Sequence, residues 1–241
     1  MCRLCRSPLS FQSSSPSWFR RRNAIGNKPT FGEWLESVFQ REVRDPSWWR
    51  DEGASLPLAP EADPIHALDL LTRLFETPSG LGRYTNPQVA QGLWFLFDST
   101  CSGYMELLRN PQLPLPSRLR CIAAIFTLNR DLFAVRCAPE IDDPNEHSLS
   151  TTCHMLWDLS EALEPNPDNP AIDQACMETL TKILEIEHPV CQQSALHGLG
   201  HWAGSYPTRI EQIVDAFLSR GSQPHPKVKD FAIKARSGDV P

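Results

Sequence analysis

The sequence predicts an all-α fold in which antiparallel helix pairs stack in a row, either as a short α-solenoid or as an irregular helical bundle. Proline repeatedly follows a residue that caps helices well, and proline is tolerated at the first helical position; the pairs are Asp63-Pro64, Asn86-Pro87 and Asn169-Pro170. Apolar residues then recur at spacings of three and four, the period of an amphipathic helix. No run of residues shows the period-two alternation of a strand.

The N-terminal half of the chain contains five predicted helices. An apolar stripe marks the first helix at about 30–44, and prolines open the next two at about 64–76 and 87–98. A short helix near 103–109 leads into a proline-rich loop. The longest helix is expected at about 117–135, where apolar residues again recur every three to four positions.

The C-terminal half is predicted to contain five more helices. An acidic loop around 139–146 precedes a helix at about 149–163. Four further helices each begin at or next to a proline, and they span about 170–186, 189–203, 207–219 and 226–236. This succession of helix, short break and helix is the pattern of a helical repeat.

One segment carries a resemblance to a known family. Residues 189–200 read Pro-Val-Cys-Gln-Gln-Ser-Ala-Leu-His-Gly-Leu-Gly, which resembles the first helix of a HEAT-type repeat. The resemblance extends over 170–236 and, more loosely, over 64–135. It implies stacked helix pairs and a concave interaction surface, but no particular partner. Some HEAT-like enzymes bind metal through His-Glu dipeptides, whereas this chain has only the reverse order, in Glu146-His147 and Glu187-His188.

Charge divides the chain into a basic tail and an acidic body. Six of the 23 basic residues and none of the 29 acidic residues precede Glu33, so the remaining chain carries a net charge of about −12. We therefore expect a disordered, serine-rich tail over 1–30, one helical domain over 31–236 and a flexible end over 237–241. An acidic body repels a polyanion, so nucleic acid is not an expected partner.

Composition also bears on membranes, compartment and cofactors. The richest apolar run, at 93–97, is far shorter than a membrane span. Most of the eight cysteines are scattered singly through a chain without a secretory signal, which predicts free thiols and a cytoplasmic protein. The arginine- and serine-rich tail leaves organellar targeting open. Cys2 and Cys5 form a C-x-x-C without a second ligand pair, so neither a zinc site there nor any bound cofactor is predicted.

The best candidate for chemistry is the pair His197 and His201. Histidines four residues apart share one face of a helix, which suits a divalent metal, and this pair lies opposite the main apolar stripe. The same placement also fits surface histidines or a second packing face. A zinc site needs a third protein ligand, and the sequence offers four candidates for it: Cys153, His154, Asp158 and Cys191.

A second candidate site is the tryptophan pair Trp48 and Trp49, which is predicted to lie outside a helix, either as an exposed recognition patch or as packing against the domain. No segment carries a catalytic signature. The sequence therefore favours a non-enzymatic interaction module, a scaffold or an inhibitor of the immunity type, whose acidic surface binds a basic protein. The alternative is a metal-binding protein or metal-dependent enzyme centred on His197 and His201.

Overall fold

The fold is all-α, as predicted. The computed structural model describes residues 28–45, 47–51, 54, 58–140, 148–220 and 224–240, and no strand occurs among them. The α-helices are α1 (Phe31–Phe39), α2 (Pro64–Glu76), α3 (Asn86–Phe97), α4 (Leu115–Leu128), α5 (Ala134–Arg136), α6 (Leu149–Met155), α7 (Pro170–Ile183), α8 (Pro189–Trp202), α9 (Pro207–Leu218) and α10 (Pro226–Ser237). Short 3-10 helices connect them: η2 (Trp48–Arg50), η3 (Pro60–Ala62), η4 (Pro78–Arg83), η5 (Met105–Leu108) and η7 (Glu161–Leu163).

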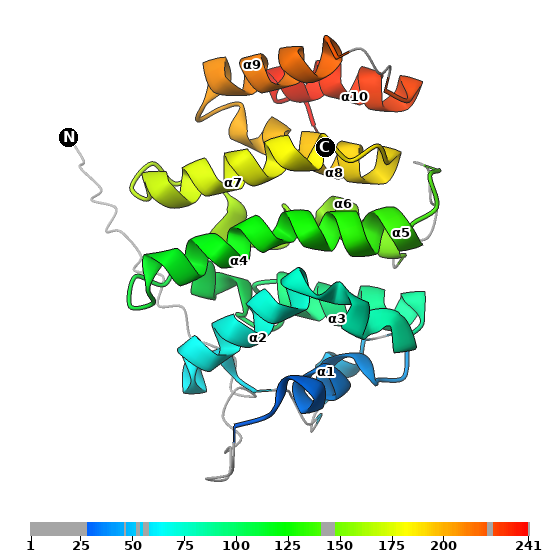
Figure 1. The fold of residues 1–241 in the computed structure, drawn as a ribbon, viewed down its shortest axis with the longest axis vertical. Coiled ribbons are helices and arrows are strands. Elements are labelled where there is room, and N and C mark those ends of the chain that lie inside the picture. The colour runs from blue at the N-terminus through cyan, green and yellow to red at the C-terminus, as the bar shows by residue number, and fades with distance from the viewer. Residues whose placement is uncertain are drawn as a thin grey trace, which may run out of the picture.

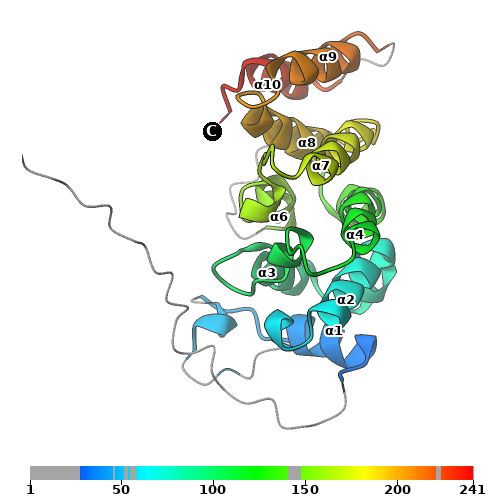
Figure 2. The same ribbon diagram turned by 90° about the vertical axis from the view of Figure 1, so that its left-hand side faces the viewer.

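The helices stack along one axis in chain order, from α1 at one end to the α9–α10 pair at the other (Figure 1). Two layers run along this axis, one with α2, α4 and α7 and the other with α3, α6 and α8 (Figure 2). Within each layer, successive helices contact one another, and α10 continues the second layer by packing on α8. The apolar faces of both layers form one continuous core.

Most helices begin where the sequence places them, although two caps differ. The Asp63 side chain accepts a hydrogen bond from the His66 N–H and caps α2, as expected. Helix α3 is capped by Thr85 instead of Asn86, because Thr85 and Gln88 form a reciprocal capping box. Asn169 precedes α7 but makes no side-chain cap.

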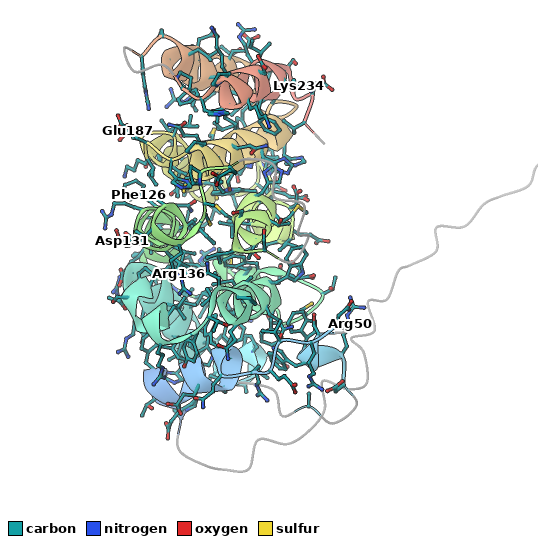
Figure 3. All side chains as sticks on the ribbon, turned by 90° about the vertical axis from the view of Figure 1, so that its right-hand side faces the viewer. Arg50, Phe126, Asp131, Arg136, Glu187 and Lys234 are labelled. Carbon is teal, nitrogen blue, oxygen red and sulfur yellow. The ribbon has the colours of Figure 1, made fainter. Side chains whose placement is uncertain are left out.

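The long helix predicted at 117–135 is interrupted. Helix α4 ends at Leu128, a π-helical turn (η6, Asn129–Phe133) follows, and α5 is short. The buried Asn129 side chain donates to the Ile125 carbonyl at 2.9 Å. Arg136, labelled in Figure 3, then ties α5 to the turn before α3, since its guanidinium donates to the Tyr84 carbonyl at 2.8 Å and to the Asn86 side chain at 2.8 Å.

The helix predicted at 149–163 is also broken, and the break contains Asp158. Helix α6 ends at Met155, a turn follows, and η7 begins after Ser160. The buried Ser160 adopts an extended backbone, and its hydroxyl accepts from the Ala162 N–H. The Leu159 carbonyl accepts a hydrogen bond from the Ser99 N–H at 2.9 Å, so its partner is a distant loop residue and not the N–H of a following helical turn. Residues 156–160 therefore form a turn that leaves the direction of α6.

The expected boundaries at the two ends shift slightly. Residues 28–30 already belong to the folded part, because Lys28 pairs with Asp63 and Thr30 caps α1. The flexible end expected over 237–241 differs from the structure, since α10 includes Ser237 and Val240 packs against the core. Most of the predicted tail, with Cys2 and Cys5, lies outside the described residues, as do residues 141–146 of the acidic loop.

Within the described residues, no helix is both long and apolar enough to cross a membrane. Six cysteines are free and buried in the core, which agrees with the expectation of free thiols: Cys101, Cys121, Cys137, Cys153, Cys176 and Cys191.

Candidate metal site

Helix α8 presents the two histidines as the sequence predicts. They share one face of the helix, with ring centroids 4.6 Å apart. Their surroundings differ, because His197 is 1% exposed whereas the His201 side chain is 38% exposed. The pair therefore extends from the core to the surface: His197 belongs to a packed face, and only His201 reaches solvent.

Asp158 completes the pair. It lies in the turn after α6, and α6 packs directly against α8. Its carboxylate oxygens approach one imidazole each, with Oδ2 at 2.7 Å from Nε2 of His197 and Oδ1 at 2.7 Å from Nε2 of His201. The two Nε2 atoms are 3.0 Å apart. These three residues form the only group of at least three histidine, cysteine or acidic side chains in the described part of the chain whose potential ligand atoms converge in this way.

The spacing of these three atoms fits a small cation. Zinc binds imidazole nitrogen and carboxylate oxygen at about 2.0–2.2 Å, so ligand atoms of a tetrahedral site lie roughly 3.3 Å apart. The observed separations of 2.7 to 3.0 Å are slightly shorter. Outward movement of a few tenths of an ångström would admit the ion.

Hydrogen bonding alone does not account for the close approach of the two imidazole nitrogens. Each Nε2 carries at most one proton. If both Nε2 atoms are protonated, they donate to Asp158 but face each other across 3.0 Å with no lone pair between them. If only one is protonated, the other has no proton for the carboxylate oxygen 2.7 Å away. A cation removes this conflict, because all three atoms then direct lone pairs at it.

The electrostatic setting favours an anionic Asp158 carboxylate beside a neutral His154 ring. Burial acts to raise the pKa of Asp158, but the hydrogen bond with His197 and the nearby imidazoles outweigh it, so that pKa lies below its usual value. His154 packs its ring against His197, with centroids 4.2 Å apart. Burial and then the charge of His197 lower the pKa of His154 to about 4. His154 is therefore neutral near pH 7 and adds no positive charge beside the cluster.

One feature of His197 limits the expected affinity. Its Nδ1 atom is buried and has no hydrogen-bond partner among the described residues, so all its polar contacts are made through Nε2. Metal-ligating histidines normally donate from their second nitrogen, and loss of such a partner weakens binding by about 10- to 100-fold. We therefore expect weaker zinc binding than at a site where both histidines donate a hydrogen bond from the ring nitrogen that does not bind the metal.

A surface pocket of about 410 Å³ opens beside the cluster. Two of the ligand residues, Asp158 and His201, line it together with Trp157, Glu164 and Pro165. Periodicity does not reveal this pocket, because only His201 comes from the face of an α-helix and the rest of its wall comes from the irregular segment after α6. Trp157 packs closely on α8 at Gly198, where an added Cβ would lie 2.8 Å from the Trp157 ring.

A buried network holds the pocket wall in place. Arg109 donates to the Ala162 carbonyl at 2.9 Å and to the Glu164 carbonyl, and it pairs with Asp173 at 3.0 Å. Asp173 is 1% exposed and also accepts from the Asn166 N–H at 2.9 Å. The loop that carries Glu164 is thus fixed by its own backbone carbonyls.

Comparisons with protein-family models, curated protein sequences and solved structures find no match. The resemblance to HEAT-type repeats therefore remains a prediction that rests on residues 189–200 and the segments around them. What the site does must be argued from its own geometry.

The other predicted site residues do not join the cluster. Of the four proposed third ligands, only Asp158 does so; the thiols of Cys153 and Cys191 instead contact Asn129, each at 3.6 Å. Trp48 and Trp49 are 2% and 9% exposed and pack against Phe95. The structure therefore shows packing for this pair, not an exposed recognition patch.

Proposed function

We propose that this protein binds one divalent transition metal ion, best fitted by zinc, through Asp158, His197 and His201. The observation that carries the proposal is the convergence of two Nε2 atoms and one carboxylate within 3.0 Å of one another. Imidazole ligands select zinc and its neighbours over calcium and magnesium, which prefer oxygen ligands.

The ligand count favours a site with an open position. Structural zinc sites have four protein ligands, whereas catalytic sites have three, with water or substrate in the fourth position. Here three ligands converge, and two of them line a pocket. A fourth position directed toward that pocket would be reached from solvent.

The first experiment measures metal in protein purified without a histidine tag. We expect about one zinc per chain by elemental analysis, or one equivalent taken up after chelation and titration against a chromophoric competitor. His201→Ala is the most informative variant, because His201 is partly exposed and its loss leaves the core packed. We expect this variant to fold, by circular dichroism, and to lose zinc binding.

His66→Ala serves as the matched control. His66 lies on α2 in another part of the stack (Figure 1), and its ring contacts the Pro29 carbonyl at 2.9 Å. Zinc binding should be unchanged in this variant. Equal zinc affinity in native protein and His201→Ala, or uptake of well below one equivalent by the native chain, would contradict the proposal.

The interaction-module hypothesis remains a prediction. The stacked helices and the acidic charge from Glu33 onward are compatible with it, but the tryptophan pair that was its candidate surface is buried. A basic protein partner would be sought by cross-linking once the metal question is decided.

A further inference from the structure

Glu164 occupies a distinctive position beside the proposed metal site. It lines the same pocket as Asp158 and His201, yet it is not one of the converging ligands. Within the described residues, no hydrogen bond or ion pair engages its carboxylate, whereas its backbone carbonyl is held by Arg109. A carboxylate without a partner, on an anchored backbone and in the same pocket as the proposed metal position, suits the role of a general base.

We propose that this pocket carries out metal-dependent hydrolysis of small, uncharged carboxylic esters or amides, with Glu164 as the general base. This inference rests on the proposed metal site, since without the ion nothing in the pocket would activate water. Glu164 is the catalytic residue it adds, because it would touch the water that reacts.

The walls of the pocket indicate the substrate class. Among the described residues that line it, none is lysine or arginine and two are acidic, so a phosphate monoester would meet no positive side chain. Trp157 and Pro165 offer apolar surface for an acyl or alkyl group.

The reaction balances with water as the only co-substrate. Glu164 would take one proton from a water molecule, and the resulting hydroxide would attack the carbonyl carbon; the ion held by Asp158, His197 and His201 would supply the polarisation of that water. The bond from that carbon to the leaving oxygen or nitrogen breaks, and protonated Glu164 returns the proton to the leaving group. The products are a carboxylic acid and an alcohol or amine. Base catalysis of this kind contributes about 10²- to 10⁴-fold to the rate.

The test compares Glu164→Gln with native protein after both are loaded with zinc. p-Nitrophenyl acetate is the probe ester, and p-nitrophenyl phosphate is the probe for the rejected substrate class. We expect kcat/KM for the ester to fall at least 100-fold in Glu164→Gln, with zinc stoichiometry unchanged and zinc affinity within about threefold of native. Turnover of the phosphate should be negligible in both proteins.

Glu161→Gln is the matched control, since it removes the same charge from an exposed residue of the same loop that does not line the pocket. Its ester turnover should equal that of native protein. Two results with stoichiometric zinc would overturn this inference and leave the metal site standing. One is equal ester turnover by native protein and Glu164→Gln. The other is ester turnover by native protein that is no faster than that of zinc in buffer. A preference for the phosphate would overturn the substrate class, and failure to bind zinc would overturn both proposals.

Discussion

At the scale of single residues, the glycines of α8 show how closely this helix is packed. A Cβ added at Gly198 would lie 2.8 Å from both Leu180 and Trp157, so the glycine allows α8 to approach α7 and the turn after α6. At Gly200 the close neighbour is Val240, from the segment after α10. Gly198 therefore lies at a close contact between helices, whereas Gly200 receives the end of the chain.

Gly198→Ala tests this packing. Alanine favours a helix over glycine by roughly 1 kcal/mol, but overpacking a core costs about 1 to 3 kcal/mol. We expect the clash to dominate and the free energy of unfolding, measured in urea, to fall. Gly32→Ala is the control, because Gly32 lies in α1 with open space around it; it should leave stability unchanged or raise it. Stabilisation by Gly198→Ala would show that α8 is packed more loosely.

At the scale of elements, the sequence predicts helices well and their interruptions poorly. The starts of α2, α7, α8 and α10 follow from proline at the first helical position. The turn after α6 does not, because it depends on Ser99, distant in the sequence, binding the Leu159 carbonyl. This explains why the two histidines were predictable from their spacing, whereas Asp158 was one of four candidates and Glu164 was missed.

The Arg109–Asp173 pair should stabilise this irregular region. Both side chains are largely buried, and removing one partner of a buried pair costs about 3 to 5 kcal/mol, because the other charge is left uncompensated. We expect Asp173→Ala to lower the free energy of unfolding by an amount in that range and to speed amide exchange at Ala162, Leu163, Glu164 and Asn166.

The surface pair of Asp215 with Arg236 supplies the control. Its distance of 2.8 Å is similar, but the side chains are 55% and 40% exposed. Exposed pairs contribute roughly 0 to 1 kcal/mol, so Asp215→Ala should have a small effect. Equal losses from the two variants would mean that burial does not determine the contribution of the Arg109–Asp173 pair.

At the scale of the whole molecule, one hydrophobic core runs through the two-layer stack from α1 to α10 among the described residues. The proposed metal site lies within this stack, where α6 meets α8, and α10 packs on the same helix. Ion binding would therefore join two elements of one layer that also contact the end of the stack. Ion binding at such a site would depend on how closely α6 packs against α8.

The buried thiols of this core make the free energy of unfolding depend on pH. Burial raises the pKa of Cys121 and of Cys176 to about 12, whereas an unfolded thiol ionises near pH 8.5 to 9. The native state therefore keeps protons that the unfolded state releases, so the stability due to these thiols is fully present below about pH 8.5 and is lost as pH rises toward 12. Urea unfolding at pH 10 should show a loss of roughly 1 to 2 kcal/mol per thiol in the free energy of unfolding relative to pH 8.

Cys176→Ala tests this assignment. The variant should be less stable than native protein at pH 8, but its loss of stability between pH 8 and pH 10 should be smaller by the contribution of one thiol. An unchanged loss would mean that Cys176 does not titrate on unfolding.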